Sequence, residues 1–67
     1  MIRYLAVYTG RGSAAGGQGY ILDVYDDDEM RRYRRELKWM VVSEHDGPRE
    51  AWAAVKRAME ADTAQEG

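Results

Sequence analysis

The stretch of residues 20–44 constrains the fold most, because its hydrophobic pattern changes twice along the chain. Residues 20–25 and residues 38–44 are rich in β-branched and aromatic side chains, and each segment predicts a strand. Residues 26–37, between them, place apolar side chains at helical spacing and are otherwise charged. The stretch therefore predicts a strand, a helix and a strand that together form one βαβ-like unit.

The predicted helix has favourable residues at its start. Asp26 is the expected N-cap, and Glu29, three residues later, is its expected capping-box partner. Acidic residues fill the first turn and basic residues the later turns, which complements the helix dipole. Met30, Tyr33 and Leu37 are expected on the buried face.

The segments around this unit complete a small domain. Residues 2–9 predict a first strand with two largely apolar faces, which is typical of a central strand covered at least partly on both sides. Residues 10–19 contain five glycines and predict a flexible hairpin loop, with Arg11 as its polar anchor. Residues 48–61 predict a second helix, and residues 63–67 are expected to fray.

The predicted element order is ββαβα, in a single compact α+β domain over residues 1–62. We expect a two-layer sandwich with a three-stranded sheet in the order 2-1-3 and both helices on one face. The other face of the sheet would then be open and would display Tyr4, Tyr8 and Tyr25. Exposed aromatic side chains of this kind are typical of a recognition surface.

The composition argues against an enzyme. The chain has 67 residues, no cysteine and a single histidine, so it can form neither disulfides nor a zinc site of the usual thiolate and imidazole ligands. Ser43, His45 and Asp46 contain the groups of a hydrolytic triad, but they lie too close in sequence to be arranged as one. We expect no catalytic residue, metal or cofactor. No signal peptide or apolar run of about 18 residues is present, and we expect a cytoplasmic protein without membrane contact.

The charges are unevenly distributed. The net charge is −2, but residues 23–29 contain five acids and no base, whereas residues 31–38 contain five bases and one acid. A binder of duplex nucleic acid usually has a basic surplus over the whole domain, which this chain lacks. Either cluster is a candidate contact surface.

Two function classes fit these features. The first is a non-enzymatic inhibitor or interaction module that covers a surface of a larger protein or nucleoprotein complex, with its acids competing for a basic groove. The second is a single-stranded nucleic-acid-binding module, in which sheet tyrosines stack on bases and the helix arginines hold phosphates. An antitoxin-like homodimer is a further alternative.

In its small size, acidity and lack of catalytic residues, the chain resembles the small inhibitors of phages and other mobile elements, anti-CRISPR proteins among them. This resemblance implies a protein that acts by binding a larger partner. The candidate partner-binding residues are Tyr4, Tyr8, Arg11, Tyr25, Asp26, Asp27, Asp28, Arg31, Arg34 and Arg35.

Overall fold

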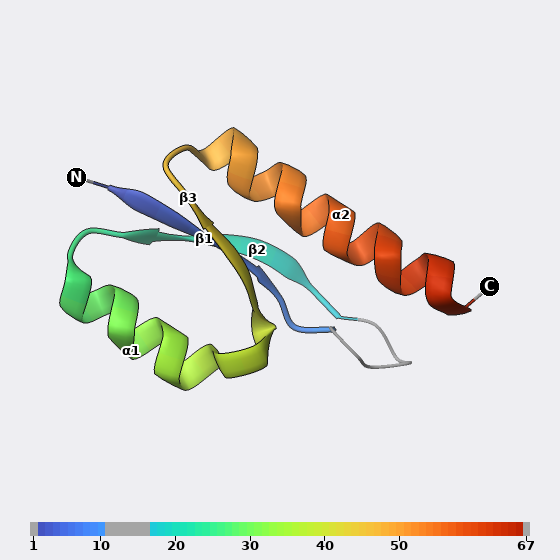
Figure 1. The fold of residues 1–67 in the computed structure, drawn as a ribbon, viewed down its shortest axis with the longest axis horizontal. Helices are drawn as coiled ribbons and strands as arrows, with labels where there is room; N and C mark the ends of the chain where they lie inside the picture. The colour runs from blue at the N-terminus through green and yellow to red at the C-terminus, as the bar shows by residue number, and fades with distance from the viewer. Residues whose placement is uncertain (1, 11–16, 67) are drawn as a thin grey trace.

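The computed structural model describes residues 2–10 and 17–66, with side chains as far as Ala61. Its elements, in chain order, are β1 (Arg3–Tyr8), β2 (Gly19–Val24), α1 (Asp27–Leu37), the short 3-10 helix η1 (Lys38–Met40), β3 (Val41–His45) and α2 (Pro48–Glu66). Arg11 and most of the glycine-rich segment lie outside the described residues. The α+β class is confirmed (Figure 1).

The sheet has three strands in the order β2-β1-β3, as predicted. Both outer strands run antiparallel to β1, so β2 and β3 are parallel to each other with β1 between them. Leu5 of β1 lies opposite Leu22 of β2 and Glu44 of β3. The helix α1 therefore connects two parallel strands by crossing over the central one, which is the predicted βαβ-like unit with a strand inserted.

One face of the sheet is covered by α1. The fully buried side chains on this face are Leu5, Val7 and Val24. The half-buried side chains that α1 packs against them are the predicted ones, Met30, Tyr33 and Leu37. These long side chains fill the space between helix and strands. All residues of α1 are described, and none of them is fully buried.

The opposite face is covered by α2. Its buried cluster consists of Ala6 from β1 and of Ala51 and Val55 from α2. These side chains are small, so the helix lies close to the sheet. At Gly19 of β2 the approach is closest, because a Cβ atom there would collide with Val55 and touch the sulfur of Met59.

The expectation that both helices share one face is therefore wrong, and the domain has three layers, with the sheet between α1 and α2 (Figure 1). The physical reason lies in β1. Successive residues of a strand point to opposite faces, and both sets in β1 are apolar. A single layer of helices would leave one of these sets in water.

The third strand is shorter than predicted. Lys38 has a positive φ of 49°, and its backbone N–H donates to the carbonyl oxygen of Arg34 at the end of α1. Residues 38–40 then form η1, and β3 begins only at Val41.

At the other end of the chain, α2 continues past Ala61, where the sequence predicted its end, to Glu66.

The start of α1 is capped as predicted, with one shift. The backbone N–H of Glu29 donates to Oδ1 of Asp26 at 2.8 Å. The Glu29 carboxylate in return accepts from the backbone N–H of Tyr25 at 3.1 Å, one residue before the N-cap. Two backbone donors that the helix itself cannot satisfy are thus bonded by side chains.

We expect Asp26→Ala to lower the free energy of unfolding by about 1 kcal/mol, because the N–H of Glu29 loses its acceptor. Urea denaturation followed by circular dichroism measures the change. Asp27→Ala is the matched control, since it removes a neighbouring carboxylate that caps no helix. An equal loss in both variants would show that charge, and not the capping bond, stabilises this end.

Candidate functional site: an acidic end surface

Both helices begin toward the same end of the molecule, where β1 starts and where β2 and β3 finish (Figure 1). Acidic side chains are stabilised at helix N-termini by the helix dipole, and both helices have them in the first turn. This topology brings together acids that are far apart in sequence. We call this surface the acidic end; its acids are Asp26, Asp27, Asp28, Asp46 and Glu50.

Two shallow hollows at the acidic end share Arg3 and Glu44 in their walls. The first, of about 410 Å³, is bounded on the α1 side by Tyr25, Asp26 and Asp27. The second, of about 480 Å³, is lined by residues 45–47 and by Glu50. Because the same arginine and glutamate line both hollows, the starts of the two helices form one continuous surface.

A network of ion pairs lies between the hollows. The Glu44 carboxylate accepts from Arg3 at 2.8 Å and from Arg34 at 2.9 Å, and Arg3 also contacts Asp46 at 3.2 Å. One carboxylate thus joins β1, β3 and α1. Arg34, predicted as a partner-binding residue, is half-exposed, and its guanidinium is paired with Glu44.

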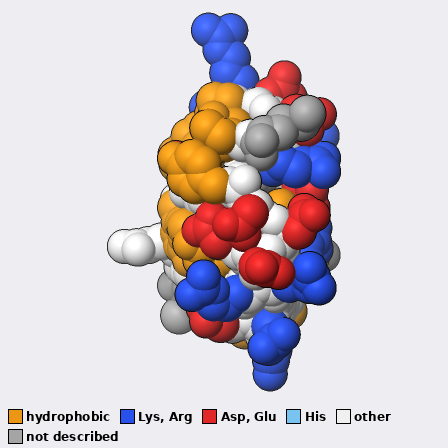
Figure 2. Space-filling view, turned by 90° about the vertical axis from the view of Figure 1, so that its left-hand side faces the viewer, with side chains coloured by type: hydrophobic (Ala, Val, Ile, Leu, Met, Phe, Trp, Pro, Cys, Tyr) orange, Lys and Arg blue, Asp and Glu red, His pale blue; other side chains and the backbone are white. Residues whose placement is uncertain are grey.

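The acids around this network remain accessible. The side chain of Asp28 is 93% exposed and that of Asp46 is 82% exposed. Asp27 is also exposed and has no ion pair with another described residue. Figure 2 shows this end of the molecule, with Asp and Glu side chains gathered near its centre and a hydrophobic area at one side.

Tyr25 supplies the aromatic side chain of the acidic end. It follows the last residue of β2, is 59% exposed and lines the first hollow. Ile2, just before β1, is 42% exposed. Tyrosine is enriched at protein interfaces, because it offers a large rigid contact area together with a hydroxyl group. The acidic end therefore combines negative charge with an accessible aromatic ring.

No family model, curated protein or solved structure matches this chain. The arrangement of its own side chains must therefore carry any argument about function.

The predicted aromatic sheet surface does not form. Helix α2 covers the face on which Tyr4 and Tyr8 were expected to be open to solvent; Tyr8 is 4% exposed, and Tyr4 is half-buried against the α2 cluster. Of the three tyrosines assigned to this surface, Tyr25 alone has a large exposed area, and it lies beyond the end of its strand.

The exposed aromatic residues that sequence patterns missed are tryptophans. Trp39 is 58% exposed, although it was assigned to a strand. Trp52 is 43% exposed and not the core anchor that was expected, because Ala51 and Val55 form the inner stripe of α2. Helical spacing gave no signal for Trp39, because α1 ends at Leu37 and the positive φ of Lys38 interrupts the helix before it.

The side chains of Ser43 and His45 are hydrogen-bonded, with 2.6 Å between Oγ and Nε2. They lie two residues apart on β3, and Asp46, the third residue of the suspected triad, contacts Arg3. The described residues contain no group of three His, Asp or Glu side chains placed to hold a metal ion. Within the same residues, no helix has the length and apolar character needed to cross a bilayer.

Proposed function

We propose that this chain is a small non-enzymatic inhibitor that uses its acidic end to cover a basic surface of a larger, nucleic-acid-binding protein. The observation that carries the proposal is that carboxylates from the starts of α1 and α2 line two hollows that share Arg3 and Glu44, the first of which contains the exposed Tyr25. Carboxylates presented in this way can take the place of phosphates in a basic groove. In its mode of action the protein would then be anti-CRISPR-like, as its size and acidity suggest.

The charges and the tyrosine have separate roles in this proposal. Exposed charges mainly steer the encounter and set its salt dependence, because they are screened over about 10 Å at 0.1 M salt. Affinity comes mostly from a few well-packed side chains, among which tyrosine is frequent. Tyr25 is therefore the proposed anchor, and Asp27, Asp28 and Asp46 the proposed steering groups.

The test compares two variants with the same net charge. Asp27→Lys with Asp28→Lys reverses the acidic end, whereas Glu36→Lys with Glu60→Lys reverses two exposed acids outside it. Both variants leave the Asp26 cap intact. Tagged wild-type protein and both variants are used to recover bound proteins from native lysate, and each recovered protein is then purified and titrated against the three chains.

We expect the acidic-end variant to bind a recovered partner at least about tenfold more weakly, because its two lysines bring like charges against a basic surface. The control should retain its affinity. Wild-type chain should also displace an oligonucleotide from the partner. Equal binding by all three chains, or a partner that binds no nucleic acid, would contradict the proposal.

A further inference from the structure

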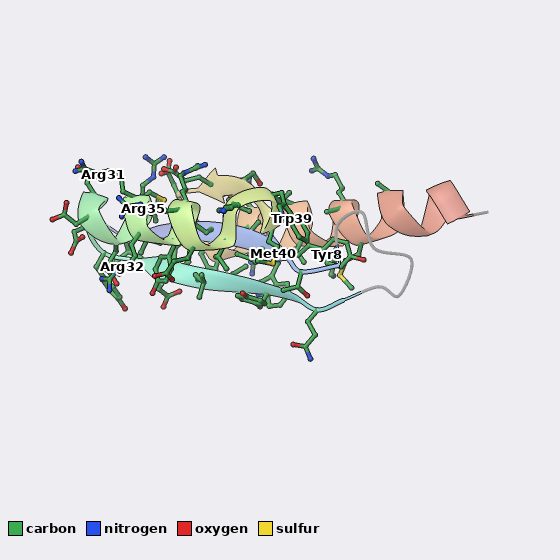
Figure 3. The ribbon with its side chains drawn as sticks, turned by 90° about the horizontal axis from the view of Figure 1, so that it is seen from below. Tyr8, Arg31, Arg32, Arg35, Trp39 and Met40 are labelled. Carbon is green, nitrogen blue, oxygen red and sulfur yellow. The ribbon has the colours of Figure 1, made fainter. Side chains whose placement is uncertain are left out.

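The outer side of α1 carries a second surface, distinct from the acidic end. It consists of Arg31, Arg32, Arg35, Lys38 and Trp39, and we call it the α1 outer face. Residues four apart lie on the same side of a helix, about 6 Å apart along its axis, so Arg31 and Arg35 form a row. Figure 3 shows Arg31 and Arg32 toward opposite edges of α1, with Arg35 between them and Trp39 beyond the end of the helix.

This face is basic and accessible. The Arg31 side chain is 73% exposed and its ion pair with Asp28, at 3.3 Å, is a surface contact. Arg32, Arg35 and Lys38 are exposed as well, and they have no ion pair with another described residue. Between Arg31 and Lys38 the sequence contains a single acid, Glu36. Arg34 points elsewhere, to Glu44. The positive charges of the α1 outer face are therefore largely available to a ligand.

Trp39 gives this basic face an aromatic platform. Its position in η1, just after the positive φ of Lys38, holds the residue out of β3 and leaves it 58% exposed. An exposed indole next in sequence to a lysine, beyond the end of an arginine-bearing helix, has a fitting partner in a strand: an unpaired base can stack on the ring while phosphates farther along meet the arginines. In a duplex the base faces are already stacked on each other.

We propose that the α1 outer face binds single-stranded nucleic acid, with one base stacked on Trp39 and phosphates held by Arg31, Arg32 and Arg35. The proposal replaces the sheet tyrosines Tyr4 and Tyr8, which α2 covers, by a tryptophan in the turn that follows α1. It uses no residue of the acidic end and stands independently of the proposed inhibitor function. Together the two surfaces fit a partner that holds an unpaired strand beside a basic groove.

A labelled oligothymidylate of about 12 nucleotides tests this proposal by fluorescence anisotropy, between about 50 and 200 mM salt. Three phosphate contacts predict a slope of about −2 in the logarithm of the binding constant against the logarithm of salt concentration. Trp39→Ala should weaken binding about tenfold, and Trp39→Phe should retain most of it. Arg35→Gln should lower the magnitude of the slope by about 0.7.

The matched controls lie on α2, across the sheet. Trp52→Ala removes a second exposed tryptophan that has Arg49 and Lys56 beside it, and Arg57→Gln removes an exposed arginine. Neither should change oligonucleotide binding. The acidic-end variant should bind the oligonucleotide at least as well as wild type, so failure of one proposal is distinguishable from failure of the other.

Three results would overturn the proposal. The first is an unchanged affinity in Trp39→Ala, which would reduce the face to a general electrostatic patch. The second is equal binding of a duplex of the same length. The third is tighter binding of polyglutamate than of oligothymidylate, which would show that the face fits an acidic protein segment.

Discussion

Leu5→Ala is expected to lower the free energy of unfolding by about 2–5 kcal/mol. Leu5 is fully buried on the central strand, in the cluster that Val7 and Val24 complete, and the rest of that cluster comes from long side chains of α1. The substitution removes buried methyl groups and leaves a cavity. A domain of this size rarely has more than about 3–5 kcal/mol of stability from its core, so the variant should be largely unfolded at room temperature.

Urea titration of wild type and variant, followed by circular dichroism, measures this effect. Ile2→Ala is the control, because Ile2 is also apolar and adjacent to β1 but is 42% exposed. Its loss should stay within about 1 kcal/mol. A Leu5 variant that is as stable as the Ile2 variant would mean that the α1 face of the sheet contributes little to the core.

Gly19→Ala is expected to cost about 1–3 kcal/mol, although alanine usually stabilises a strand position relative to glycine. A Cβ at this position would collide with a methyl group of Val55, a fully buried side chain held by α2. The helix would have to move away from β2, and the contacts of Ala51 with Ala6 would loosen. Thermal denaturation should show a decrease in Tm.

Gly47→Ala is the matched control. A Cβ at Gly47 would meet the carboxylate of Glu50, which is the free end of a flexible side chain and can move aside. In a double-mutant cycle, Val55→Ala should restore part of the stability of Gly19→Ala, because it removes the colliding methyl group. Equal losses at both glycines, with no coupling to Val55, would contradict close packing of α2.

Much of the fold follows from local sequence patterns. The strand–helix–strand unit and the Asp26 cap were predicted because they depend on spacing and capping chemistry within a few residues, and the sheet order followed from the two apolar faces of residues 2–9. The placement of α2 was missed, although its signal was present. The two apolar faces of β1 require cover on both sides, and the prediction of two layers left one of them without it.

The candidate site was predictable only in part. Asp26, Asp27 and Asp28 were candidates because they cluster in the sequence, and Tyr25 because it was expected on an open sheet face. Asp46 and Glu50 join them only through the topology of the sheet. Trp39 was missed because hydrophobic patterns do not distinguish a strand from a single 3-10 turn of three residues. The turn depends on the positive φ of Lys38. Lysine rarely adopts this conformation, and the neighbouring residues give no sign of it.

The way in which α1 packs on the sheet links the two proposed surfaces. This helix carries acids of one surface and the arginines of the other, yet it contacts the sheet through half-buried apolar side chains and the Arg34–Glu44 ion pair, with no fully buried residue of its own. Elements held in this way open locally at a lower free energy than the core. A ligand bound at either surface would reduce the local opening of α1. Binding of the second ligand would then cost the protein less conformational entropy. If both proposals hold, we expect a protein partner and a strand of nucleic acid to bind with positive cooperativity.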